Sequence, residues 1–136
     1  MSASPEPESL LNQMPFSTAC GVALTSASAS EVTGALAWAP DLCTTGGLLH
    51  GGALMALADS LGGICAFLNL PEGSGTATIE SKTNFFRAVR EGTVHATTRP
   101  LHVGRTTIVV QTDITDDRNR RIAQVTQTQA ILPAAG

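Results

Sequence analysis

A single carboxylate lies in an otherwise apolar segment in the middle of the chain. Residues 46–63 read GGLLHGGALMALADSLGG, and Asp59 is the only charged residue among them. An ionised carboxylate in apolar surroundings is costly unless it is paired or hydrogen-bonded, and residues 51–81 contain no Lys or Arg that could pair with it. We therefore expect Asp59 either to be exposed where this segment meets a cleft or to be held for chemistry as a general base. A structural aspartate, hydrogen-bonded to backbone at an interface, is the alternative.

Glycines and one histidine precede this carboxylate at the predicted start of a helix. The turn from Gly46 to Gly52 leads into a helix N-terminus, where free backbone N–H groups and the positive end of the helix dipole converge. Such a turn could bind a phosphate or stabilise an oxyanion. The phosphate-loop patterns GK[ST] and GxGxxG are absent, and a plain helix entry explains the glycines as well. His50 precedes the helix and is expected to be a structural hydrogen-bonding group, with no neighbours at metal-ligand spacing.

The segment that carries Asp59 is predicted to be a long helix. From Gly51 to Leu68 apolar residues recur at helical spacing, and the opposite face is mostly Ala, Gly, Met and Phe. A helix that is apolar nearly all round must be wrapped by protein. The charge of Asp59 and the breaks at Gly62 and Gly63 argue against a membrane span. Each of these two glycines costs about 1 kcal/mol of helix propensity relative to Ala, and we expect them where another backbone approaches closely.

The rest of the chain is predicted to be β-structure. Strand-like runs at 20–28 and 32–39 precede the helix, and runs rich in Thr, Val, Ile and Phe follow it at 76–86, 93–98, 106–114 and 122–131. Residues 91–92 and 116–119 are expected to form hairpin turns, and Gly104 a bulge or a strand end. The pattern predicts an α+β fold, an antiparallel sheet around one long central helix. Because one small sheet cannot cover such a helix, we expect a second copy of the chain to cover the remainder.

Composition restricts the class of protein. The chain has 136 residues, 43% of them apolar and 14% charged, which suits one globular domain. We expect a flexible lead-in over residues 1–12, without the features of a signal peptide, and a single domain over residues 13–136. A net charge of −3 provides no basic field for nucleic acid. Three widely spaced cysteines are typical of reduced, structural thiols in the cytoplasm.

Three blocks of the sequence, LLHGGALMALADSLGG, SKTNFFRAVREG and PLHVGRTT, resemble the hotdog-fold acyl-CoA thioesterases. The resemblance runs from about residue 38 to residue 132 and is closest to the phenylacetate-degradation type and the 4-hydroxybenzoyl-CoA type. It implies a hotdog fold and hydrolysis of an acyl-CoA thioester, with an aryl-CoA as one option, to the free acid and CoA. It also implies a homodimer, assembled further as a dimer of dimers, and no cofactor apart from the CoA of the substrate.

The resemblance also implies roles for individual residues. The carboxylate nine residues after the histidine, here Asp59, acts as nucleophile or as base for water. The backbone N–H just after the histidine, here Gly51, polarises the thioester carbonyl and belongs to the facing subunit of the dimer. Thr78 stands where relatives keep a hydroxyl that holds the attacking water. The blocks that contact the nucleotide and phosphates of CoA contain Arg87, Arg105 and Thr106.

Two positions depart from the family pattern. Relatives often have Asn or Gln six residues before the histidine, where this chain has Thr44, and the aryl-CoA branch has a threonine four residues after its acid, where this chain has Gly63. Together with the residues named above, the set of candidate catalytic residues is Asp59, Gly51, His50, Thr78 and Thr44.

Two other classes of function remain open. A non-catalytic acyl-CoA-binding protein would use Asp59 only as a polar contact. A hotdog hydratase or dehydratase would pair its acid with a catalytic histidine on the helix, and none follows Asp59.

Overall fold

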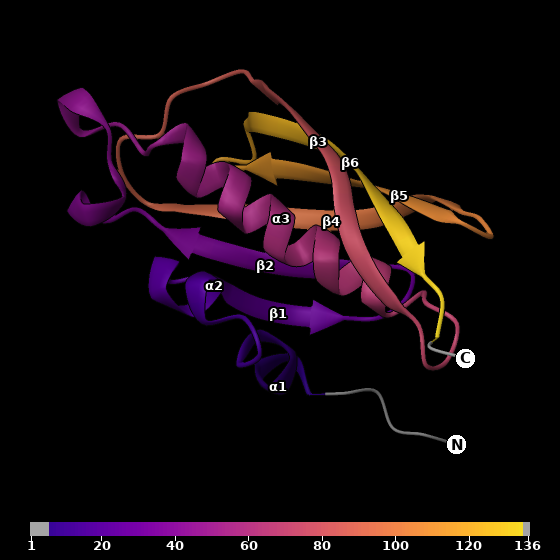
Figure 1. Ribbon diagram of the computed structural model, residues 1–136. Helices are drawn as coiled ribbons and strands as arrows, with labels where there is room; N and C mark the ends of the chain where they lie inside the picture. The colour runs from indigo at the N-terminus through magenta and orange to yellow at the C-terminus, as the bar shows by residue number, and fades with distance from the viewer. Residues whose placement is uncertain (1–5, 135–136) are drawn as a thin grey trace.

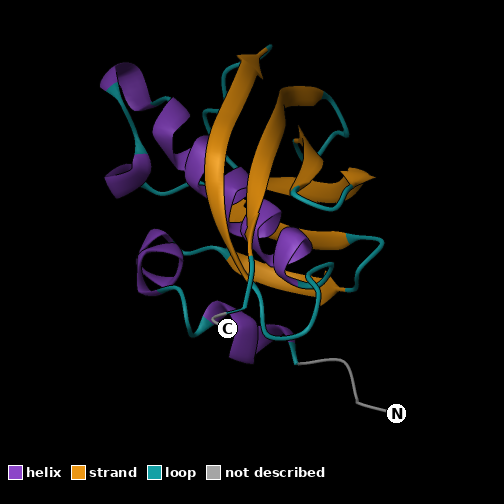
Figure 2. Cartoon of the chain, turned by 45° about the vertical axis from the view of Figure 1, so that its right-hand side comes forward, coloured by secondary structure: helices purple, strands orange, loops and turns teal. Residues whose placement is uncertain are grey.

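A six-stranded antiparallel sheet wraps around one long helix in the computed structural model, which describes residues 6–134 (Figure 1). The helix α3 (Gly51–Phe67) lies along the inner face of the curled sheet, as the second view also shows (Figure 2). This arrangement confirms the predicted α+β architecture and the bounds of the helix. The strand order is β1-β2-β4-β5-β6-β3. The strands are β1 (Ala23–Ala27), β2 (Val32–Ala37), β3 (Gly75–Phe85), β4 (Thr93–Val103), β5 (Thr107–Thr115) and β6 (Arg121–Leu132).

The N-terminal part differs from the sequence-based expectation. Two short helices, α1 (Pro7–Leu11) and α2 (Pro15–Cys20), precede the sheet. The expected lead-in over residues 1–12 therefore contains a helix, and Leu10 of that helix is buried against the domain; residues 1–5 lie outside the described residues. The first strand begins at Ala23, because α2 continues to Cys20 and ends at Gly21, whose φ of 88° suits glycine.

The strand connections confirm two of the three predicted turns. Residues 116–119 join β5 to β6, and Gly104 ends β4, where its N–H donates to the Thr107 carbonyl at 2.8 Å. The hairpin expected at residues 91–92 is wrong: β3 pairs with β6, while β4 pairs with β2 and β5. β4 is also longer than predicted, because it continues past Pro100 through a bulge to Val103.

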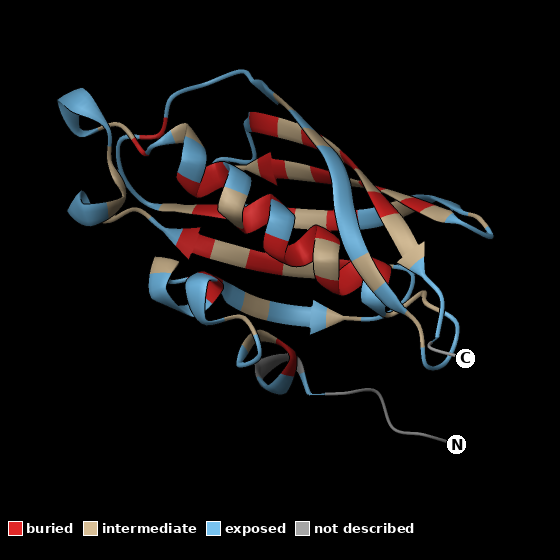
Figure 3. Ribbon diagram, in the orientation of Figure 1, coloured by how far each residue is buried: buried red, intermediate tan, exposed pale blue. Residues whose placement is uncertain are grey.

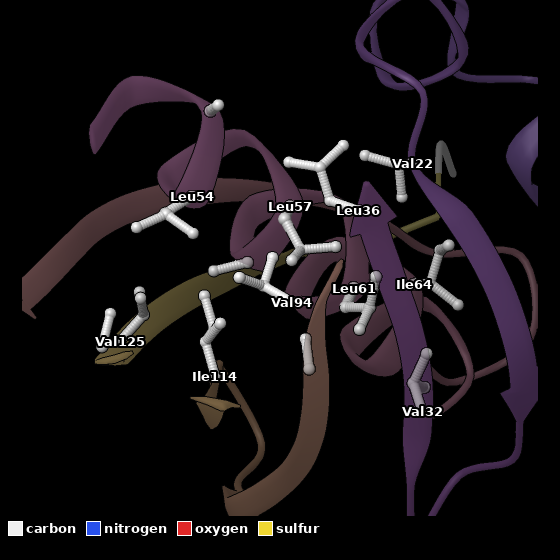
Figure 4. Packing of buried hydrophobic residues seen from close by; sticks show 14 of the residues in the cluster. Val22, Val32, Leu36, Leu54, Leu57, Leu61, Ile64, Val94, Ile114 and Val125 are labelled. Carbon is white, nitrogen blue, oxygen red and sulfur yellow. The ribbon is translucent and has the colours of Figure 1, made fainter. Parts of the chain in front are cut away.

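The core forms between the inner side of α3 and the sheet. Leu57 and Leu61 are fully buried and lie in one cluster with strand residues, among them Val32, Leu36, Val94, Ile114 and Val125 (Figure 4). Burial of each such leucine stabilises the fold by about 1.5–3 kcal/mol. Burial also raises the pKa of the Cys65 thiol to about 11, so this thiol stays protonated and acts as a small apolar side chain, as expected.

The outer side of α3 is not covered by residues 6–134 of its own chain. Met55, Asp59, Gly63 and Phe67, spaced four residues apart, form what we call the open stripe of the helix (Figure 3). Met55 is 39% and Phe67 54% exposed, and a Cβ added to Gly63 would meet nothing within 4 Å. On the neighbouring side, Ser60 binds Ser17 of α2 at 2.6 Å. The described part of the chain has no helix with the length and apolar character needed to cross a membrane.

Candidate active site

His50 forms the N-cap of α3. Its Nδ1 accepts a hydrogen bond from the Gly52 N–H at 2.7 Å, and its carbonyl accepts one from the Ala53 N–H at 2.9 Å. These bonds satisfy two of the free N–H groups at the helix start. No described residue accepts a hydrogen bond from the Gly51 N–H. The expected structural role of His50 thus fits its geometry, and the Gly51 N–H remains available to a ligand.

The segment before the helix is held by backbone bonds. The His50 N–H donates to the Leu42 carbonyl and the Leu49 N–H to the Val89 carbonyl, both at 2.8 Å. Thr44 precedes a short 3-10 turn (Thr45–Gly47); its N–H donates to the Leu48 carbonyl at 2.8 Å, and its side chain is exposed. Thr44 therefore shapes the entry to the helix, and it forms no hydrogen bond with Asp59 within residues 6–134.

The ring of Phe85, at the end of β3, lies against Gly51. A Cβ added to Gly51 would stand 3.1 Å from Cζ of this ring, closer than ordinary contact. Glycine at this position therefore lets the helix start pass close to Phe85. Because the ring is about half exposed, an apolar surface borders the free N–H group.

Asp59 lies exposed on the open stripe and is bound by a buried amide. Gln127 of β6 donates from Nε2 to Asp59 Oδ1 at 2.6 Å, although the Gln127 side chain is only 1% exposed. In the single chain the Asp59 carboxylate is exposed, and whether it serves chemistry stays a prediction. Its partner is a side chain of the last strand, and not the backbone.

Thr78 belongs to the same hydrogen-bonded network. Its Oγ1 accepts from Gln129 Nε2 at 2.8 Å and from Gln127 Nε2 at 3.3 Å, and Thr76 Oγ1 donates to Gln129 Oε1 at 3.1 Å. The structure therefore links Thr78 to Asp59 through Gln127. The two glutamines were missed from the sequence. Their signal was present, because both fall on the inward, apolar positions of a predicted strand, where a polar residue needs an explanation.

Gly62 makes room for this network. A Cβ at Gly62 would come within 2.9 Å of Gln127 Cδ and closer still to Oε1. The expectation that a backbone approaches closely is therefore wrong for Gly62, and for Gly63 it stays a prediction. Gly62 admits a side-chain amide, and Gly63 faces open space.

Gly51 and Asp59 are too far apart in one chain to act on one carbonyl group. Eight residues of α-helix separate them, which corresponds to about 12 Å along the axis. A reacting carbonyl must lie about 3 Å from both its N–H donor and the attacking group. One chain alone does not complete the site implied by the resemblance.

Arg87 lines an open pocket at the N-terminal end of α3. The pocket has a volume of about 490 Å³ and lies between residues 87–92 and the turn between β5 and β6. Its basic residues are Arg87, Arg90, Arg118 and Arg120. Among the described residues, only Arg120 of these four forms an ion pair, with Asp116 at 2.8 Å. Three guanidinium groups are therefore available to an anion.

The pocket also contains three acidic residues, Glu91, Asp116 and Asp117, and the two aspartates are bound by neighbouring groups. Partial desolvation opposes ionisation of Asp116, but hydrogen bonds from Arg120 and Arg118 outweigh it and hold the pKa of that carboxyl below its usual range. The hydrogen bond from His95, together with that from the Thr93 N–H, lowers the pKa of Asp117. Both carboxylates are thus ionised at neutral pH and already bound.

Arg105 and Thr106 lie away from Arg87. They form the turn between β4 and β5, at the far end of β4 from the pocket (Figure 1). Ten residues of strand correspond to about 33 Å. The three residues implied to contact CoA are therefore not brought together within one chain.

Comparisons with known proteins agree with this fold. The family model described as "Thioesterase superfamily" matches residues 46–123. A candidate esterase of Mycobacterium tuberculosis is 31% identical over 91% of this chain and 91% of its own length. The 1,4-dihydroxy-2-naphthoyl-CoA hydrolase of Escherichia coli is 37% identical over 63% of each chain. This chain covers 57% of a further relative, a candidate esterase of Vibrio cholerae.

A solved structure matches the whole domain. A mutant thioesterase from Pseudomonas aeruginosa superimposes with a TM-score of 0.90 at 27% identity, covering 96% of both chains. The family match includes the helix start, Asp59 and Thr78, so the fold and the family agree on the same segment. The chain belongs to the thioesterase superfamily, and it is a hotdog-fold member of this family of enzymes that act on thioesters.

Proposed function

We propose that this protein hydrolyses an acyl-CoA thioester to the free acid and CoA, with Asp59 as nucleophile or general base and the Gly51 N–H as oxyanion donor. The observation that carries the proposal is the carboxylate of Asp59, which is open to a substrate and fixed by a 2.6 Å hydrogen bond from Gln127. A carboxylate held in one orientation can attack or deprotonate with little reorganisation.

The two mechanistic routes share the same groups. As a base, Asp59 takes a proton from a water held by Thr78, the hydroxide adds to the thioester carbon, and the C–S bond breaks to release CoA. As a nucleophile, Asp59 adds to the carbon itself, the C–S bond breaks to release CoA, and water hydrolyses the resulting mixed anhydride to the free acid and regenerates the Asp59 carboxylate. On either route the Gly51 N–H stabilises the negative charge on the carbonyl oxygen, aided by the helix dipole. Water and the acyl-CoA are the only reactants, so the proposed reaction needs no further cofactor.

A second copy of the chain is proposed to complete each site. The distance of about 12 Å along α3 between Gly51 and Asp59 of one chain supports a site to which two chains contribute. The open stripe and the edge strand β3, with Ile79 and Phe85 exposed, provide an uncovered surface beside both groups. A homodimer through this surface would bury it and bring the partner's carboxylate to the helix start. Further association into a dimer of dimers is a proposal from the resemblance alone.

Release of CoA from a panel of aliphatic and aromatic acyl-CoA substrates tests the proposed reaction. We expect steady thiol release from at least one class, measured with a chromogenic disulfide. A non-catalytic acyl-CoA-binding protein would bind the panel in calorimetry without releasing thiol. A hydratase would change an enoyl-CoA without breaking its C–S bond, and α3 carries no histidine for that chemistry. The aromatic arm is included because the Escherichia coli relative is a naphthoyl-CoA hydrolase.

Arg87→Ala is expected to raise KM for acyl-CoA substrates about tenfold and to leave kcat nearly unchanged, because a guanidinium in the pocket holds a phosphate without entering the reaction. The comparison substrate is the same acyl group on a short thiol without the nucleotide, for which KM should not change. Arg99→Ala is the matched control, because Arg99 is paired with Glu31 at 2.6 Å and does not line the pocket. An equal rise of KM for both substrates would make Arg87 structural. Arg105 and Thr106 are proposed to contact the CoA bound by another subunit.

A further inference from the structure

The buried amide of Gln127 is the direct partner of Asp59, and neither the sequence nor the family resemblance assigned it a role. We propose that Gln127 is a positioning residue, which fixes the Asp59 carboxylate for attack and holds Thr78 beside it. The inference rests on the proposed function of Asp59.

Only one orientation of the amide suits this place. In the orientation observed, Nε2 donates to Asp59 at 2.6 Å and to Thr78 at 3.3 Å. With the amide reversed, its oxygen would stand against the carboxylate oxygen, and the two acceptors would repel each other. The observed orientation leaves Gln127 Oε1 buried without a hydrogen-bond partner among residues 6–134, which is unfavourable for folding. The chain leaves an acceptor unsatisfied in order to donate to Asp59.

Glycine at position 62 of α3 leaves space for the Gln127 amide. Oε1 and Cδ of Gln127 occupy the space that a Cβ of residue 62 would need. Gly62 therefore accepts a loss of helix propensity at the position three residues after Asp59, on the side that faces β6. A side chain at position 62 would displace the Gln127 amide and also crowd Val110 at 3.3 Å, so glycine here is consistent with a positioning role for Gln127.

No charged group competes for Asp59 on the sheet. Within the register of β3 and β6, Ser81 faces Gln127, while Glu80 and Lys82 pair with residues 128 and 126, which point to the opposite face. Thr78 is uncharged, and Asp59 is the one acidic residue of α3. The hydrogen bond from Gln127 is thus the main polar restraint on this carboxylate in the described chain.

Three variants and one control test the proposal. Gln127→Met keeps the shape and removes the donor, and we expect kcat to fall about ten- to a hundredfold, with KM within about twofold. Gly62→Ala keeps the glutamine but displaces it, so kcat should fall although helix propensity improves. Gln124→Met is the matched control, because Gln124 also donates from β6 to an aspartate, Asp113, at 2.9 Å, but on the other face of the sheet; its kcat should stay within about twofold of wild type.

Gln127→Glu supplies a signature that a merely structural role would not give. Two carboxyl groups at this distance share one proton, and the protonated one can donate to Asp59 as the amide does. We expect kcat relative to wild type to rise as the pH is lowered from about 8 to about 6. For Gln127→Met, kcat relative to wild type should stay low over this whole pH range.

The outcomes separate this inference from the proposed function. Folded Gln127→Met with kcat near wild type overturns the positioning role. If that variant does not fold, unchanged turnover of Gly62→Ala, or a pH-independent ratio for Gln127→Glu, overturns it instead. If Asp59→Asn is inactive while the Gln127 variants are fully active, only the inference fails. If Asp59→Asn is itself fully active, the proposed function fails first.

Discussion

Asp59→Asn is expected to lower kcat by about a hundredfold or more and to leave the fold intact. The asparagine oxygen can still accept the hydrogen bond from Gln127 Nε2, so the local network has no reason to rearrange. The substitution removes the negative charge, and with it the ability to take a proton from water or to attack the thioester carbon. Steady-state kinetics on the best acyl-CoA of the panel, together with a thermal unfolding curve, measure both expectations.

The Thr78→Val variant is the companion measurement for this prediction. If Asp59 acts as a base on a water held by Thr78, loss of the hydroxyl should lower kcat as well. If Asp59 attacks the thioester carbon directly, Thr78→Val should lower kcat by a smaller factor. A folded Asp59→Asn enzyme with near-normal turnover would remove Asp59 from the chemistry altogether.

Mixing two inactive variants, Asp59→Ala and Gly51→Val, is expected to restore about a quarter of the wild-type activity. The active site is proposed to use Asp59 of one chain and Gly51 of the other. In a mixed dimer one site then contains both defects and the other contains neither. Random association makes half of the dimers mixed, and each of these has one intact site out of two. The variants are unfolded and refolded together, and activity is measured against each variant refolded alone.

The fraction of dimers that contain one chain of each variant must be measured, because the expected activity depends on it. Native mass spectrometry gives the fraction of mixed dimers directly, since the two variants differ in mass. Gly51→Val has a second use, because a side chain there also presses on the Phe85 ring, and its unfolding curve shows whether the dimer tolerates that contact. Mixed dimers without activity would contradict the proposal that each site combines Asp59 of one chain with Gly51 of the other.

The long helix could be predicted from the sequence because its signals are local. Glycines mark its start, apolar spacing continues through it, and Pro71 with the glycines beyond it follows its end. The pairing of β3 could not be predicted in this way. The turn residues at 91–92 are real, and Gly92 has a φ of 79°, but local turn chemistry does not say which strand will lie beside β3.

The candidate site was predictable to a similar extent. The carboxylate Asp59 and the start of the helix were evident from residue types, and the resemblance added Thr78. Gln127 was not found, because it lies 68 residues after Asp59 and meets it only once β6 has joined the sheet. A polar residue at an inward strand position indicates that a partner exists, but not which one.

The order of the strands also has a consequence for synthesis of the chain. β3 leaves the ribosome directly after the helix, yet among residues 6–134 its neighbour in the sheet is β6, which follows β4 and β5 in the sequence. Until β6 emerges, β3 has no partner to pair with, and Asp59 has no amide to orient it. The earlier strands and α3 can pack first, so the helix can be in place while its carboxylate is still unrestrained. Asp59 is therefore not oriented by Gln127 until β6 has joined the sheet, and a nascent chain that lacks β6 carries the acid without the amide that restrains it.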